Sequence, residues 1–215
     1  MTPFFKKFSS SKNESHAALL DHDLSRLSYT IIDCEMTGLN AKSDRLLSIG
    51  AVKIINGQIR LEDSFYKVIR QRPKTLKLDT MPIHRLGHQK VAEGEAQDEV
   101  IAKLETFCEG TVTLGHFFQI DLDFLNPLLK KPFELPSLDT RKIALWILNK
   151  KNPHFDHRAQ LQLEKVCETW KIPRFPAHHA LGDALRTACL FLALQSEVNQ
   201  AGIYNFSELL KIAKV

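Results

Sequence analysis

The sequence predicts an α/β domain built on a mixed β-sheet with helices on its faces. Two observations lead to this fold class: three β-rich segments come first, joined by hairpin signals, and helical and β-rich segments then alternate. The chain has 215 residues, of which 44% are hydrophobic and 25% charged, as in a soluble globular protein. This length suits one large domain, or one domain with appendages.

The three β-rich segments occupy residues 29–34, 46–55 and 58–66. The first is mostly apolar, as expected for a buried strand. Asn56-Gly57 is a hairpin turn signal, so the third segment should return antiparallel to the second.

Helices and one further strand are expected after a polar region at 67–93. Apolar residues at helical spacing predict most of them, and Asn205 or Ser207 can cap a last helix near the C-terminus. The expected helices cover 94–108, 122–130, 138–148, 160–170 and 180–198, and the strand covers 111–115.

Three regions follow from these patterns. Residues 1–27 are expected to form an N-terminal extension, in which Leu20, Leu24 and Leu27 share one face of a short helix. Residues 28–198 should form the main domain, and 199–215 a C-terminal helical segment.

Several classes of protein are excluded by composition. The longest uninterrupted apolar run, 188–194, is too short to cross a bilayer, and the N-terminus lacks the apolar core of a signal peptide. The four cysteines form no CxxC pair, which argues against zinc or disulfides and for a reducing compartment. We therefore expect a cytoplasmic protein without a membrane anchor; the net charge of +4 says little about partners.

Two carboxylates stand at the end of the first strand, in Ile31-Ile32-Asp33-Cys34-Glu35-Met36-Thr37-Gly38-Leu39. Because strand side chains alternate, Asp33 and Glu35 point to the same side. A hard cation such as Mg²⁺ would offset their repulsion. The alternative is that both are simply exposed acids.

Two further acids lie at the starts of predicted helices. Asp121 follows the 111–115 strand and is either a functional acid or an N-cap, with Asp123 as its rival. Asp183 stands among apolar residues and needs a metal or a partner such as Arg186.

Two histidines precede Asp183. Helical spacing places His179 nearest to Asp183, whereas His178 falls in the preceding loop. Either histidine would suit a general base near neutral pH, and spacing does not choose between them.

These segments together resemble the DEDDh 3′–5′ exonucleases, also called DnaQ-like, which include the exonuclease domain of the DNA polymerase III epsilon subunit. Asp-x-Glu-x-Thr-Gly-Leu matches at 33–39, His-Asn-x-x-Phe-Asp at His116 and Asp121, and His-x-x-x-x-Asp-Ala at 178–184. Phe117 stands where the second motif has Asn. The resemblance covers about residues 28–198 and implies an RNase H-like fold with a five-stranded mixed sheet flanked by helices.

The resemblance also implies the chemistry. Asp33, Glu35, Asp121 and Asp183 would hold two Mg²⁺ or Mn²⁺ ions, and His178 would be the general base. Residues implied to bind substrate are Thr37, Gly38, Leu39, Ile83, His84 and His116.

The implied function is hydrolysis of single-stranded nucleic acid from the 3′ end to nucleoside 5′-monophosphates. DNA is favoured by the likeness to epsilon, and RNA ends or a proofreading subunit bound to a DNA polymerase or sliding clamp are the alternatives. A non-catalytic binding module on the same fold is disfavoured, because all five catalytic positions are filled.

Basic and aromatic residues suggest how a substrate could bind. Residues 67–90 carry seven basic side chains and one acid, and 141–174 carry eight basic and three acidic. Either run could follow a phosphate backbone or form a solvated face. Phe117 and Phe118 could stack on bases or belong to the core. The apolar segment 203–215 is a candidate docking helix, and Gln200–Phe206 faintly resembles a sliding-clamp peptide.

Overall fold

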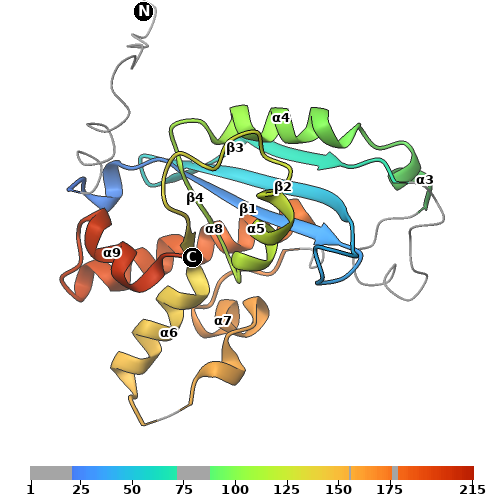
Figure 1. The fold of residues 1–215 in the computed structure, drawn as a ribbon. Helices are drawn as coiled ribbons and strands as arrows, with labels where there is room; N and C mark the ends of the chain where they lie inside the picture. Colours follow the sequence, from blue (N-terminus) through green and yellow to red (C-terminus); the bar gives the residue numbers. More distant parts are fainter. Residues whose placement is uncertain (1–20, 72–87, 155, 176–178) are drawn as a thin grey trace, which may run out of the picture.

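The predicted mixed sheet is confirmed in the computed structural model, which describes residues 21–71, 88–154, 156–175 and 179–215. Five strands lie in the order β3-β2-β1-β4-β5 (Figure 1). The central strand β1 (Tyr29–Met36) pairs antiparallel with β2 (Leu46–Ile55) and parallel with β4 (Val112–Gly115). The short strand β5 (Leu138–Asp139) pairs parallel with β4.

The predicted hairpin joins β2 to β3 (Gln58–Val68), which pair antiparallel. Asn56 and Gly57 both have positive φ, at 52° and 71°. A tight hairpin turn of the primed type requires this backbone conformation, which Asn and Gly adopt readily.

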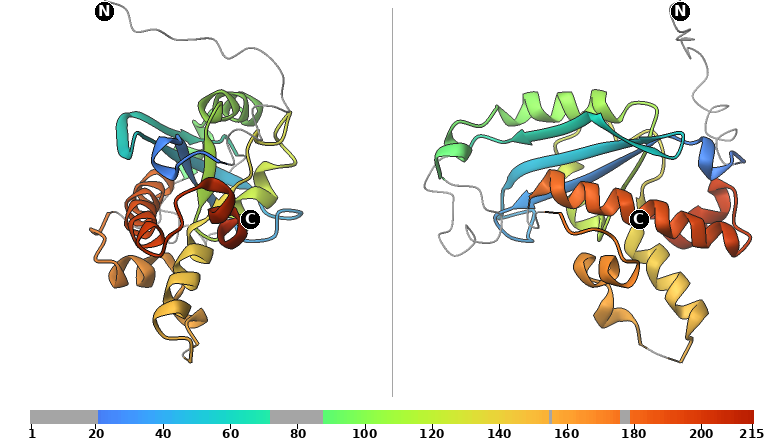
Figure 2. Two further views of the ribbon diagram at one scale, coloured as in Figure 1. Left: turned by 90° about the vertical axis from the view of Figure 1, so that its left-hand side faces the viewer. Right: turned by 180° about the vertical axis from the view of Figure 1, so that it is seen from behind.

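Helices cover both faces of the sheet. Helix α4 (Gln97–Cys108) lies over one face, and the long helix α8 (Ala180–Gln200) crosses the other (Figures 1 and 2). Tyr29 and Ile31 of β1 belong to the hydrophobic cluster that contains the buried residues of α8, here called the α8 core. Ile32 and Cys34 belong to the cluster that contains the buried residues of α4, the α4 core. Strand alternation therefore turns the odd-numbered residues of β1, among them Asp33, toward α8.

The remaining helices differ somewhat from the sequence predictions. Helix α5 (Gln119–Leu125) begins and ends earlier than the predicted 122–130 helix, since Pro127 has no N–H to extend it. The predicted 160–170 helix is a 3₁₀ turn (Arg158–Gln160) followed by α7 (Leu163–Thr169). Between them, the Leu161 carbonyl accepts a hydrogen bond from His116 instead of one from the helix. Among the described residues before α8, the other α-helices are α3 (His88–Ala92) and α6 (Thr140–Lys151).

The N-terminal helix prediction is wrong for the residues that the structure describes. Leu24–Arg26 forms a single 3₁₀ turn capped by Asp23, and Leu20 lies outside the described residues. Leu24 and Leu27 are nevertheless buried in the α8 core.

The predicted C-terminal helix is α9 (Phe206–Ala213), and Asn205 caps it by accepting from the Glu208 N–H at 2.9 Å. Its apolar face belongs to this chain's own core, because Phe206, Leu209 and Ala213 are buried there. Of the two aromatic residues of the clamp-like segment, Phe206 is thus buried internally, whereas Tyr204 is exposed.

Two features concern the cysteines and the lengths of the helices. All four cysteines are free thiols. Within the described ranges, every helix is too short or too polar to cross a bilayer.

Candidate active site

Three of the predicted acids meet at one point. Carboxylate oxygens of Asp33, Glu35 and Asp183 all lie within 4.8 Å of one another, and all three residues are partly buried. Asp33 and Glu35 come from the end of β1, and Asp183 from the first turn of α8. Among the described residues, this is the one cluster with the spacing of a metal site.

Gly50 of β2 permits the approach of α8 that completes this cluster. A Cβ atom at Gly50 would collide with the backbone of Ala180 and Leu181, at the start of α8. The missing side chain lets the first helical turn lie directly on the sheet. Asp183 therefore reaches the carboxylates of β1.

Asp121 is a buried acid behind this cluster. It lies in the first turn of α5, and its Oδ1 accepts a hydrogen bond from the backbone N–H of Cys34 at 2.9 Å. That bond fixes the carboxylate against the strand that carries Asp33 and Glu35. Its rival Asp123 is exposed and bonds to Gln119 on its own helix, so the structure favours Asp121.

Burial and mutual repulsion disfavour ionised carboxyl groups in the cluster. Loss of hydration, followed by the charges of Asp121, Asp183 and Glu35, holds the pKa of Asp33 well above its usual value. Loss of hydration, followed by the charges of Asp183 and Asp121, raises the pKa of Glu35 to about 8. Burial raises the pKa of Asp121 to about 7, although the Cys34 N–H opposes the shift. Oxygen donors that repel one another in this way fit a hard divalent cation, which would favour their charged forms.

Arg186 supplies one positive charge beside the cluster. Its Nη1 lies 3.4 Å from Asp183 Oδ1, and the two side chains are only 6% and 13% exposed. Asp183 therefore meets both expectations for it: it pairs with Arg186 and also joins the carboxylate cluster.

The two candidate bases are placed differently. His178 lies outside the described residues. His179 precedes α8, and its ring stacks on Tyr66 of β3, with ring centroids 4.4 Å apart. His179 is thus held against β3, and the role of His178 as base stays a prediction.

The Thr37-Gly38-Leu39 loop after β1 is braced by Asp44. Asp44 accepts hydrogen bonds from the Thr37 hydroxyl at 3.2 Å and from the Asn40 N–H at 3.0 Å. Leu39 stands out from this loop with 76% of its surface exposed. An exposed leucine held on a braced loop is available for contact with a ligand. Of the other predicted substrate residues, Ile83 and His84 lie outside the described residues.

His116 is buried, and both of its ring nitrogens are hydrogen-bonded inside the protein. Nε2 donates to the Leu161 carbonyl at 2.7 Å, because a carbonyl can only accept, and Nδ1 shares a 2.9 Å hydrogen bond with the Thr140 hydroxyl. Burial lowers the pKa of His116 to about 4. His116 thereby links β4 to α6 and to the residues before α7, and its predicted contact with substrate stays a prediction.

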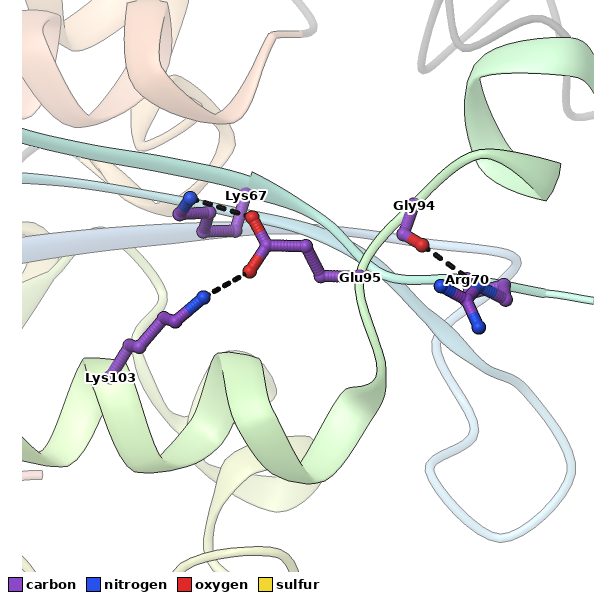
Figure 3. A network of polar contacts seen from close by, with 5 residues as sticks. All are labelled: Lys67, Arg70, Gly94, Glu95 and Lys103. Atoms are coloured by element: carbon purple, nitrogen blue, oxygen red, sulfur yellow. Dashed lines mark hydrogen bonds and ion pairs between the residues drawn. The ribbon is translucent and has the colours of Figure 1, made fainter.

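The basic run after β3 is partly neutralised. Glu95 accepts from Lys67 at 2.6 Å and from Lys103 at 2.5 Å, and Arg70 Nε donates to the Gly94 carbonyl (Figure 3). Hydrogen bonds from the two lysines lower the pKa of Glu95 to about 2. Lys67 and Arg70 therefore hold the segment before α4 against β3, and residues 72–87 lie outside the described residues.

Comparison with known families agrees with this geometry. A profile of the RNase T family, described as an exonuclease family, matches residues 30–191. The chain belongs to the RNase T exonuclease family. The predicted resemblance to DnaQ-like exonucleases is confirmed, and members of the family hydrolyse phosphodiester bonds.

Sequence relatives within the family include DNA polymerase III proteins. An epsilon-like protein from Rhodobacter capsulatus is 28% identical over 202 residues, which are 90% of this chain and 27% of that protein. The PolC-type DNA polymerase III of Thermotoga petrophila is 27% identical over 193 residues, 88% of this chain and 13% of that protein. The chain thus spans less than a third of either relative.

Solved structures of exonucleases have the same fold. Escherichia coli exonuclease I in complex with a dT13 oligonucleotide superposes with a TM-score of 0.68 at 14% identity, covering 82% of this chain and 42% of that one. A 3′-exonuclease that recognises a histone mRNA stem-loop gives 0.64 at 17% identity, covering 86% and 70%. The RNase H-like fold is therefore confirmed.

Some residues at the site escaped the sequence analysis. Asp139 is a buried acid that caps α6, and its charge contributes to the raised pKa of Asp121. An Asp directly before a helical pattern was a visible capping signal for Asp139. The stack of Tyr66 on His179 left no signal, because it joins segments 113 positions apart.

Proposed function

We propose that this protein is a metal-dependent 3′–5′ exonuclease that shortens single-stranded nucleic acid, preferentially DNA, to nucleoside 5′-monophosphates. The observation that carries the proposal is the convergence of Asp33, Glu35 and Asp183, with Asp121 fixed behind them. The preference for DNA rests on the likeness to DNA polymerase III proteins over most of the chain.

The carboxylates have a division of labour in this proposal. Asp33, Glu35 and Asp183 would hold one Mg²⁺ or Mn²⁺ ion, and Asp33 with Asp121 a second. When bound, the cations would stabilise negative charge on the phosphate and favour ionisation of the attacking water. His178 would accept the proton from that water, and the 3′-oxygen would leave.

The loop after β1 and the histidines serve to place the substrate end. Leu39 offers an exposed apolar side chain to the terminal bases, and Asp44 holds Thr37 and Asn40 on either side of Gly38 and Leu39. Ile83, His84 and His116 complete the proposed set by resemblance to the family.

Digestion of 5′-labelled single-stranded DNA and RNA of one sequence tests the proposal. We expect a ladder shortening from the 3′ end in Mg²⁺ or Mn²⁺, faster on DNA and abolished by chelator. Asp33→Ala should remove all activity, whereas Asp123→Asn, an exposed acid on α5, should retain it. Faster digestion of RNA than of DNA would show that the protein is an exoribonuclease. Turnover in excess chelator would contradict the metal mechanism.

A further inference from the structure

Phe117 has an unusual backbone for its residue type. Its φ is +57°, in the left-handed region, which the aromatic side chain disfavours and Asn tolerates. Asn is also the residue that the family motif places here, as the sequence comparison indicated. Phe117 therefore occupies a backbone conformation that suits the motif's Asn better than its own side chain. Strain of this kind persists where the side chain has a use.

The positive φ separates two consecutive aromatic rings. Phe118 is fully buried, and its ring fills the space beside Gly115, where a Cβ would collide with it. Phe117 is only partly buried. Of the two alternatives for these rings, membership in the core is thus met by Phe118 and not by Phe117.

Arg141 covers the Phe117 ring. Its guanidinium carbon lies 4.0 Å from the ring centroid. Both residues are anchored on one buried atom, since Asp139 Oδ1 accepts from the Phe117 N–H at 3.1 Å and from the Arg141 N–H at 2.8 Å. Asp139 is 3% exposed. The aromatic ring and the cation are thus held together before any ligand arrives.

Arg141 differs from two other cations of the second basic run, which pair with carboxylates. Lys151 pairs with Glu197 at 2.6 Å, and Arg174 pairs with Glu168 at 3.2 Å. No carboxylate of the described residues lies within ion-pair distance of the Arg141 guanidinium, and its buried Nε has no hydrogen-bond partner among them. Asp139 interacts electrostatically with Arg141 from beyond ion-pair distance. No described carboxylate occupies the guanidinium itself, which leaves it open to an anion.

The pair also lies beside the carboxylate cluster. Phe117 follows the end of β4, which runs parallel to β1, so both strands finish at the same edge of the sheet. The Phe117 carbonyl accepts the Ile120 N–H at 3.0 Å, in the turn that leads to Asp121. A strand of nucleic acid that reaches the carboxylates passes this edge.

We propose that Phe117 and Arg141 form a docking element for one nucleotide of the single-stranded substrate, with the Phe117 ring stacked on its base and the Arg141 guanidinium bound to a phosphate. Aromatic stacking tolerates any base, and arginine forms paired hydrogen bonds with phosphate oxygens. The inference rests on the proposed function, because it assigns residues to the substrate of that same site.

Binding of 12-nucleotide DNA and RNA strands tests the element, with Ca²⁺ replacing Mg²⁺ to suppress turnover. We expect Phe117→Asn to weaken binding about 10- to 100-fold. Because Asn relieves the strain, this variant should unfold at the same temperature as wild type or a higher one. Tyr204→Ala, which removes an exposed aromatic residue elsewhere, is the matched control and should bind normally.

Abasic substitutions locate the stacked base. One abasic position near the 3′ end should weaken binding to wild type but not binding to Phe117→Asn, since the variant has already lost the stack. Arg141→Met should lower the slope of log affinity against log salt by about one, and Lys150→Met on the same helix should not.

The outcomes separate the two proposals. If wild type shortens the strands while Phe117→Asn and Arg141→Met bind as tightly as it does, the docking element is wrong and the exonuclease proposal stands. If wild type neither binds nor shortens either polymer, both proposals are wrong.

Discussion

At the residue scale, the charged forms of Asp33 and Glu35 are unfavourable in the folded protein. Asp33 and Glu35 sit side by side, partly buried, and their repulsion opposes folding whenever both are charged. Arg186 offsets part of the charge through Asp183. A protein tolerates such an arrangement when the ligand that relieves it also performs the function.

Because the ionised carboxylate of Glu35 is unfavourable in the folded protein, we expect that removing its charge stabilises the fold. Folding raises the pKa of Glu35 from 4.5 to about 8, so ionised Glu35 destabilises the metal-free protein. This destabilisation is absent below about pH 4.5, grows as the pH rises, and is complete above about pH 8. In chelator at pH 9, Glu35→Gln should be more stable than wild type by about 2–4 kcal/mol. The gain should vanish near pH 4.5. Urea unfolding at both pH values measures this difference in unfolding free energy, with Glu99→Gln, a change of an exposed acid, as control. If Glu35→Gln is no more stable than wild type at pH 9, the charge of Glu35 does not destabilise the fold.

At the element scale, the carboxylate cluster depends on the close contact between α8 and the sheet. Asp183 is brought to β1 because α8 begins directly on Gly50, where a side chain would meet helix backbone. Backbone cannot move aside as a flexible side chain can, so the contact leaves no room for adjustment.

Gly50→Ala should therefore displace the first turn of α8. We expect a loss of unfolding free energy of about 1–3 kcal/mol or more, because the added methyl group overpacks the contact. Metal binding should weaken at the same time, since Asp183 moves with the helix. Urea unfolding and Mn²⁺ titration measure the two effects, and an unchanged Mn²⁺ affinity in a destabilised protein would show that Asp183 does not depend on this contact.

The molecule as a whole brings its acids from three distant segments, so metal binding should stabilise the entire fold. At Mg²⁺ concentrations about 100 times the dissociation constant, linkage adds about 2.7 kcal/mol of unfolding free energy. For a chain of this length the melting temperature should rise by roughly 5–10 °C. Thermal unfolding with and without Mg²⁺ tests this; Asp123→Asn should keep the shift and Asp183→Asn should lose most of it. Equal shifts in both variants would place the metal elsewhere.

Local patterns in the sequence were sufficient for much of the architecture. The hairpin at Asn56-Gly57, strand β2, and helices α8 and α9 lie where turn chemistry, apolar periodicity and capping predicted them. Short elements were less well predicted, because tertiary hydrogen bonds decided them: Leu161 stays outside α7 while its carbonyl serves His116.

The sequence by itself determined the order of the main elements and predicted the acids of the candidate site, because both depend on patterns within short segments of the chain. Only the tertiary structure decided that Asp121, and not Asp123, accepts the hydrogen bond from the Cys34 N–H. It also decided that Arg186 is buried against Asp183. Likewise, only the folded chain shows that the Phe117 ring lies against the Arg141 guanidinium and not in the core. These outcomes depend on contacts between segments far apart in sequence, and on a backbone conformation that its own residue type disfavours.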